Sequence, residues 1–144
     1  MTREELRDRV CVMMGGRAAE MLLCGDVSTG AQNDLEQATA VAEQMVRRFG
    51  MSDRLGPRTL TGGLSSGGPF GDTVAYSEVT QRAIDDEISV VLDTAMHRAR
   101  EIVAARRVEV ERVAERLLVE ETMERGELEA LTRRPAATTQ TAAE

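Results

Sequence analysis

The sequence predicts an all-α protein, a helical bundle of about four helices with one glycine-rich loop. Apolar residues recur at helical spacing in long stretches of the 144-residue chain. Hydrophobic residues make up 42% of the chain but aromatic residues only 2%, so Leu, Val, Ala and Met must fill the core. Such a core suits the packing of helix on helix. No stretch shows the alternation of apolar and polar residues that is typical of a β-strand.

The first predicted helix covers residues 2–25. Thr2 is its candidate N-cap, Glu5 can complete a capping box, and Gly25 stands where the helix is expected to stop. Its apolar positions keep the helical period: Leu6, Val10, Met13, Met14, Ala18, Met21 and Leu22.

Two adjacent glycines, Gly15 and Gly16, interrupt this helical pattern. Each costs about 1 kcal/mol relative to alanine inside a helix. The pair therefore predicts either a local kink or the close approach of another element, which a side chain would block.

A second helix is predicted from about Gln32–Asp34 to about Phe49, with Gly50 ending it. Its apolar stripe consists of Leu35, Ala38, Val41, Ala42, Met45, Val46 and Phe49. Residues 58–76 then become rich in glycine and lose periodicity, which predicts a flexible surface loop.

Ser77 is the candidate cap of a long third helix that ends near Ala105. Its predicted apolar face is Ile84, Ile88, Val91, Leu92, Ala95, Ala99, Ile102 and Val103. A fourth helix, residues 108–121, is expected to pack Val110, Val113, Leu117 and Leu118, and Thr122 to cap a last short turn. Residues 133–144 contain no core-forming side chains and are expected to be disordered. Residues 1–132 are thus expected to form one domain.

The charge and the cysteines exclude some classes of protein. A net charge of -7 argues against nucleic-acid binding, which requires a basic face. Cys11 and Cys24 lie among apolar residues, so we expect buried free thiols in a reducing compartment, with a disulfide as the alternative. No apolar run approaches the roughly 20 residues that span a bilayer, and no signal peptide is visible, so we expect the chain as given to be cytoplasmic.

Only two positions invite a chemical interpretation. His97 is the single histidine, and its neighbours one turn away, Asp93 and Glu101, predict a solvated helix face. One histidine so placed makes neither a metal site nor a catalytic triad. Asp34 lies in the first turn of a predicted helix, where acids are common because free N–H groups and the helix dipole stabilise them. The alternative is a metal-ligating carboxylate, which needs imidazoles from elsewhere.

Four motifs in register change the interpretation of the chain as a whole. They are "GGRAAE" at 15–20, "STGAQND" at 28–34, "A..MV..FGMSD..GP" at 42–57 and "YSE.T...ID.E" at 76–87. Through them, residues 1 to about 131 closely resemble the peptidase domain of the FtsH family of ATP-dependent, membrane-anchored zinc metalloproteases.

The resemblance implies a chemistry and an assembly. Members are hexameric AAA+ proteases that thread membrane and soluble proteins into a proteolytic chamber. Two histidines of an H-E-x-x-H helix and one aspartate hold their zinc, and the glutamate of that helix activates the zinc-bound water. Asp34 matches the aspartate ligand. The matching motif residues with a structural role are Gly15, Gly16, Arg17, Glu20, Ser28, Thr29, Gly30 and Asn33, and the two helical glycines would let the helix lie close to the zinc helix.

The chain also departs from the family. It contains no H-E-x-x-H and no ATPase module, so it lacks two zinc ligands and the general base. We expect the C-terminal part of such an enzyme, with no catalytic residue, no zinc bound by this chain alone and no activity alone. Without the zinc helix, the face around Val12, Met13, Ala19 and Leu23 is expected to be exposed, leaving the chain marginally stable or homo-oligomeric. The alternative is a stand-alone degenerate peptidase-like domain that binds a protein partner.

Overall fold

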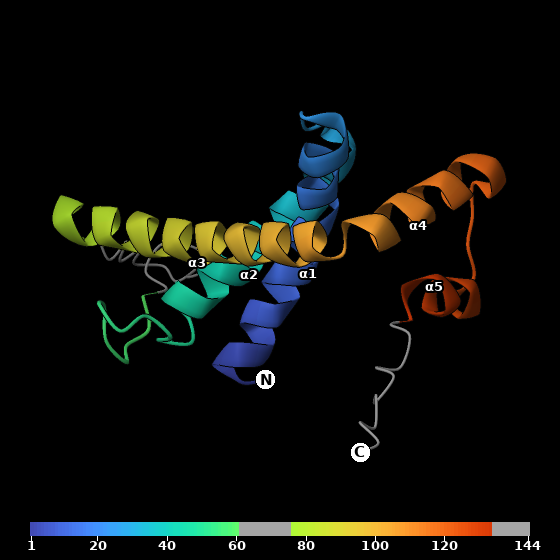
Figure 1. The fold of residues 1–144 in the computed structure, drawn as a ribbon. Coiled ribbons are helices and arrows are strands. Elements are labelled where there is room, and N and C mark those ends of the chain that lie inside the picture. The colour runs from blue at the N-terminus through green and yellow to red at the C-terminus, as the bar shows by residue number, and fades with distance from the viewer. Residues whose placement is uncertain (61–75, 134–144) are drawn as a thin grey trace, which may run out of the picture. The chain divides into compact units, whose positions relative to one another are not determined.

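The computed structural model describes residues 1–60 and 76–133, and every regular element within these two ranges is a helix (Figure 1). The helices are α1 (Arg3–Cys24), the 3₁₀ helix η1 (Thr29–Ala31), α2 (Gln32–Arg47), α3 (Glu78–Ala105), α4 (Arg107–Glu120) and α5 (Arg125–Thr132). The predicted all-α class is confirmed. None of these helices is long and apolar enough to cross a bilayer. The described part of the chain divides into two compact units, one within residues 1–105 and one within residues 106–144.

The predicted ends of α1 are confirmed by their hydrogen bonds. Thr2 Oγ1 accepts from the Glu5 backbone N–H at 3.2 Å, and Glu5 Oε2 accepts from the Thr2 N–H at 2.6 Å, which completes the capping box. These bonds lower the pKa of the Glu5 carboxyl. At the other end, Gly25 has a φ of 72° and donates its N–H to the Met21 carbonyl. Only glycine adopts this left-handed conformation without strain.

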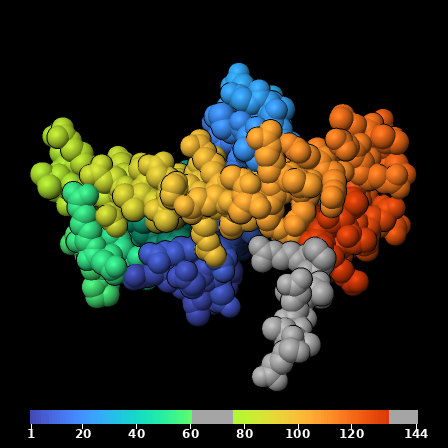
Figure 2. Space-filling model, in the orientation of Figure 1, coloured from blue at the N-terminus to red at the C-terminus, as the bar shows by residue number. Residues whose placement is uncertain are grey.

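The core of the first unit forms where α1, α2 and α3 contact one another. Side chains four residues apart give α1 a buried row: Leu6, Val10, Met14 and Ala18. The central cluster of buried residues is Val10, Cys11, Met14, Ala18, Ala38, Ala95 and Ala99. Every member that α2 and α3 contribute is an alanine, and such small side chains let helix axes approach closely. Figure 2 shows the side chains of α3, in yellow, covering one face of this unit.

A second cluster lies further along α2 and α3. Its buried members are Ala42, Val46, Leu60, Ile84 and Ile88. Leu60 is only 2% exposed, and its N–H donates to the Arg47 carbonyl at 2.6 Å. The first residues of the predicted 58–76 loop are therefore packed, and its residues 61–75 lie outside the described ranges, as do 134–144 of the predicted tail.

Three residues of the first unit that were assigned to apolar stripes are exposed, so those assignments were wrong: Met21, Phe49 and Ile102. Met21, in the last turn of α1, is 37% exposed. α2 ends at Arg47 instead of near Phe49, because the Phe49 N–H bonds back to the Gln44 carbonyl and Gly50 turns with a φ of 59°. Phe49 is left 51% exposed beyond the helix. Ile102 is 47% exposed, whereas the neighbouring Val103 packs on the core, since successive helical residues point about 100° apart.

The second unit differs most from its prediction. None of the residues that the structure describes in α4 or α5 is buried. Leu118, predicted to pack, is 85% exposed, and Leu117 is 39% exposed. The cap of α5 is Glu124 and not Thr122, because Glu124 forms a capping box with Glu127. Val110 and Val113 are half-buried. The apolar spacing of α4 therefore identified the helix correctly, but the predicted packing was wrong for Leu117 and Leu118.

The helix α1 runs through Gly15 and Gly16 without interruption. A Cβ added to either glycine would meet no atom within 4 Å in the part of the chain that the structure describes. The pair therefore does not interrupt the helix, and the local kink, the first alternative, stays a prediction. The second alternative was the close approach of another element. No described residue approaches the two glycines in this way, so the approach stays a prediction for a segment outside the described residues.

A glycine comparison tests this open space. Gly16→Ala should raise the free energy of unfolding by about 1 kcal/mol, because it removes backbone entropy from the unfolded chain and meets no atom. Gly56→Ala is the matched control. It also meets no atom, but its φ of +78° should make alanine destabilising by about 1 kcal/mol. Urea unfolding followed by circular dichroism at two protein concentrations measures both. If Gly16→Ala were destabilising only at the higher protein concentration, a second copy of the chain would lie against this face.

A buried serine joins two of the sequence motifs. Ser52, of "FGMSD", is 5% exposed and donates its hydroxyl to Glu87 Oε2, of "ID.E", at 2.6 Å. The Ser52 hydroxyl oxygen also accepts from the Leu55 N–H at 3.1 Å. The two motifs thus contact each other: one lies in the turn that follows α2, and the other lies in α3.

Removing that hydroxyl should destabilise the first unit. Ser52→Ala leaves the Leu55 N–H and the Glu87 carboxylate without this partner, at a cost of about 1–3 kcal/mol. The control Ser89→Ala, on the exposed side of α3, should change stability by less than about 0.5 kcal/mol. Equal unfolding midpoints for the two variants in urea would contradict the assigned contact.

Candidate functional site

Asp34 is the third residue of α2, directly after the 3₁₀ helix η1. Its side chain is exposed, and it makes no hydrogen bond or ion pair with any residue in 1–60 or 76–133. The other acids between residues 20 and 36 are all engaged: Glu20 accepts from Ser28, Asp26 from the Val27 N–H, and Glu36 from the Gln32 amide. Within this stretch, Asp34 is the carboxylate left available to an external ligand.

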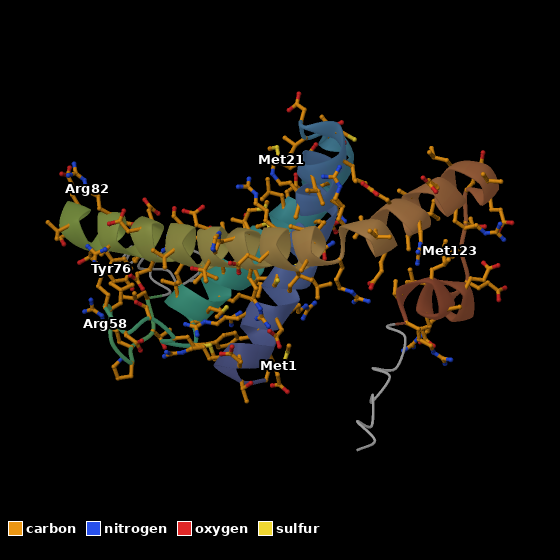
Figure 3. All side chains as sticks on the ribbon, in the orientation of Figure 1. Met1, Met21, Arg58, Tyr76, Arg82 and Met123 are labelled. Carbon is orange, nitrogen blue, oxygen red and sulfur yellow. The ribbon has the colours of Figure 1, made fainter. Side chains whose placement is uncertain are left out.

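The connection that leads to Asp34 is tied to the last turn of α1. Glu20 Oε2 accepts from the Ser28 N–H at 2.9 Å, and Glu20 Oε1 accepts from the Ser28 hydroxyl at 2.8 Å. Ser28 Oγ in turn accepts from the Gly30 N–H at 3.1 Å and caps η1. The two bonds from Ser28 lower the pKa of the Glu20 carboxyl, with a smaller contribution from the charge of Arg17. Figure 3 labels Met21, the residue after Glu20, near this end of α1.

The remaining motif residues surround the same connection. Gly30 stands where a Cβ would lie 3.2 Å from Ser28 Oγ and 3.7 Å from Glu20 Oε1, which explains the absence of a side chain there. Thr29 and Asn33 are exposed on either side of Ala31, which is buried. The sequence identified these positions only as motif members. It missed the pairing of Glu20 with Ser28, for which a serine directly before a short helix is the available signal.

The face of α1 that was expected to be uncovered is exposed in part. Val12 is 79% exposed, and Gly16 beside it is exposed. Met13, Ala19 and Leu23 are half-buried, and Met13 packs against the core cluster. The open surface is therefore narrower than predicted and centres on Val12 and Gly16.

The described residues do not complete a zinc site by themselves. No group of three or more His, Cys, Asp or Glu side chains in the described ranges is placed to hold a metal, whereas zinc sites use three or four protein ligands. His97 lies on the exposed side of α3 with its Nε2 3.3 Å from Glu101 Oε1, as the helical spacing predicted.

The cysteines offer no site either. Both thiols are free, as expected. Cys11 is buried, which raises the pKa of its thiol, whereas Cys24 is exposed. The expectation that both are buried was wrong for Cys24, because it is the last residue of α1 and lies beyond the buried row. Among the described residues, Asp34 therefore remains the candidate ligand.

Comparison with known proteins gives the family. The model of peptidase family M41 matches residues 1–131. The ATP-dependent zinc metalloprotease FtsH 1 of Conexibacter woesei is 42% identical over 133 residues, which cover 90% of this chain and 20% of the relative. FtsH 3 of Synechocystis sp. is 43% identical over 137 residues, covering 90% and 22%, and FtsH of Ralstonia pickettii is 42% identical over 136 residues, covering 90% and 19%.

The chain thus spans about a fifth of the length of the curated relatives it matches. The matched region contains all four motifs. It also contains Glu20 and Ser28, whose hydrogen bonds hold the connection that leads to Asp34. The resemblance drawn from those motifs is confirmed: the chain belongs to peptidase family M41, the family of the FtsH-type zinc metalloproteases.

Proposed function

We propose that this chain is the C-terminal part of the peptidase domain of an ATP-dependent FtsH-type zinc metalloendopeptidase, and that Asp34 is its third zinc ligand. The observation that carries the proposal is the carboxylate of Asp34, which is exposed and free of partners in the described structure while the connection before it is held by hydrogen bonds. A ligand must be available to the metal and must be well placed. The Asp34 carboxylate is available, and the hydrogen bonds of Glu20, Ser28 and Gly30 hold the connection that leads to it.

The proposal divides the zinc site between this chain and a further segment. A catalytic zinc with three protein ligands polarises the peptide carbonyl and supplies a nucleophilic water near neutral pH. The single histidine of this chain is on α3 and is paired with Glu101. Two imidazoles and the general base must therefore come from outside these 144 residues. By itself the chain neither holds zinc nor cleaves peptides.

The setting of the complete enzyme follows from the family. Its substrates are proteins, its assembly is a homo-oligomer of six subunits, and a membrane anchor elsewhere holds the peptidase domain on the cytoplasmic or organelle-internal side. Nucleic acid has no part in this function, in keeping with the net charge of -7.

One observation favours a second candidate function. Val12 is 79% exposed beside Gly16, on a helix face where the described structure places nothing. A stand-alone, degenerate peptidase-like domain would use this face to bind a protein partner, such as an intact protease subunit. In that case the chain would join an assembly without contributing Asp34 to a zinc site.

Reconstitution separates the two candidates. The chain is combined with an FtsH relative from which the matching segment has been deleted, and zinc content, zinc affinity and ATP-dependent casein cleavage are measured. The chain alone should show neither tight zinc nor cleavage, and the combination should show both. Asp34→Ala should lower zinc affinity by at least about tenfold, whereas Glu36→Gln, in the same helical turn, should leave it unchanged.

Two results would decide against the proposal. Cleavage by the isolated chain, or full zinc affinity with Asp34→Ala, would mean that the metal is held by other groups. Binding to intact subunits without any recovery of zinc or cleavage would favour the partner-binding domain instead.

A further inference from the structure

We infer that Glu20 is a positioning residue for Asp34: by holding Ser28 with both carboxylate oxygens, it fixes the start of α2 and the direction in which Asp34 is presented. This inference rests on the proposed role of Asp34 as a ligand and extends it to a residue of a different helix.

The contact is a short chain of hydrogen bonds across the turn between α1 and α2. Each oxygen of Glu20 accepts from a different donor of Ser28, the N–H at 2.9 Å and the hydroxyl at 2.8 Å. The Ser28 oxygen then accepts from the Gly30 N–H at 3.1 Å, so the bonds continue into η1. Hydrogen bonds to an ionised carboxylate are stronger than neutral ones, and two of them fix orientation as well as distance.

The start of α2 has no side-chain cap of its own. Its N-cap is Ala31, which cannot accept a hydrogen bond through its side chain, and Asp34 bonds to nothing in the described ranges. What precedes the helix must therefore define its first turn. The backbone N–H of Gln32 donates to the Thr29 carbonyl, so η1 passes without a break into α2. Holding Ser28 consequently holds the residues that lead to Asp34.

The same geometry argues against a direct role of Glu20 at a metal. Both of its oxygens already accept bonds from Ser28, and the carboxylate is turned toward the connection. Those bonds also favour the ionised form of Glu20, in which both oxygens are acceptors. Glu20 therefore acts on Asp34 through the backbone, and a glutamine there would place an amide donor against one of the two Ser28 donors.

The test begins with the 144-residue chain in solution. Glu20→Gln and Ser28→Ala should raise amide hydrogen exchange at Ser28 and Gly30 by about tenfold or more. The ¹⁵N order parameter of Asp34 should fall from about 0.85, the value of rigid backbone, toward about 0.6. Exchange at the core amides of Val10 and Ile84 should not change, which separates local loosening from global unfolding. Ser28→Thr, which keeps the hydroxyl, should retain the wild-type values.

The second measurement is the zinc affinity of the reconstituted enzyme. Glu20→Gln should weaken zinc affinity by about tenfold and leave the KM for casein unchanged. Ser28→Thr and the control Glu36→Gln should leave zinc affinity unchanged. An unchanged order parameter at Asp34 in Glu20→Gln would overturn the inference. So would full zinc affinity of Glu20→Gln in an enzyme where Asp34→Ala loses it, although the ligand role of Asp34 would stand. Zinc retained by Asp34→Ala would overturn the proposed function and the positioning role together.

Discussion

The first unit depends on one packing constraint, the crossing of α1, α2 and α3 over small side chains. The buried row of α1 meets only alanines among the fully buried residues that the other two helices bring to the central cluster. Replacing such an alanine with a larger residue would push the helix axes apart, because a close-packed core has no free volume to absorb it. Because α1 and α2 contact each other and both contact α3, the connection between Gly25 and Ala31 turns the chain back from the end of α1 to the start of α2 (Figure 1). The position of Asp34 follows from that reversal.

Local signals in the sequence predicted the helices well. The capping box of Thr2 and Glu5, the left-handed Gly25 and the cap of α3 by Ser77 depend on residues within a few positions of one another, and all three are present. Whether an apolar residue is covered depends instead on what crosses the helix. Phe49 and Leu118 have the expected spacing and are exposed, because no described element packs over them. Periodicity therefore identifies a helix and its apolar side. It does not show how much of that side is packed against another element.

The site was less accessible to sequence reasoning. From residue type and position alone, Asp34 was an ordinary acid in the first turn of a helix, and its candidacy as a ligand came from the family motifs. The contact of Glu20 with Ser28 was not predicted, since it depends on the left-handed turn at Gly25 that folds the chain back on itself. The structure adds the physical reason why "GGRAAE" and "STGAQND" belong together: one supplies the acceptor and the other supplies the donors.

A ligand that is one part of a divided site gains from being rigid before the metal arrives, because the entropy of ordering it is then not subtracted from the binding free energy. The connection before Asp34 is held by hydrogen bonds from Ser28 to the ionised carboxylate of Glu20, so this interaction depends on pH. The pKa of Glu20 is lower in the folded chain than in the unfolded one. The contribution of ionised Glu20 to the free energy of unfolding is therefore fully present above the pKa of the unfolded chain, about 4.3. It is lost as the pH falls through the lower pKa of the folded chain. Across the neutral range Glu20 is therefore expected to keep its two hydrogen bonds to Ser28. Under the proposal that Asp34 is a zinc ligand, the two imidazoles would meet a carboxylate whose preceding connection is already held by hydrogen bonds.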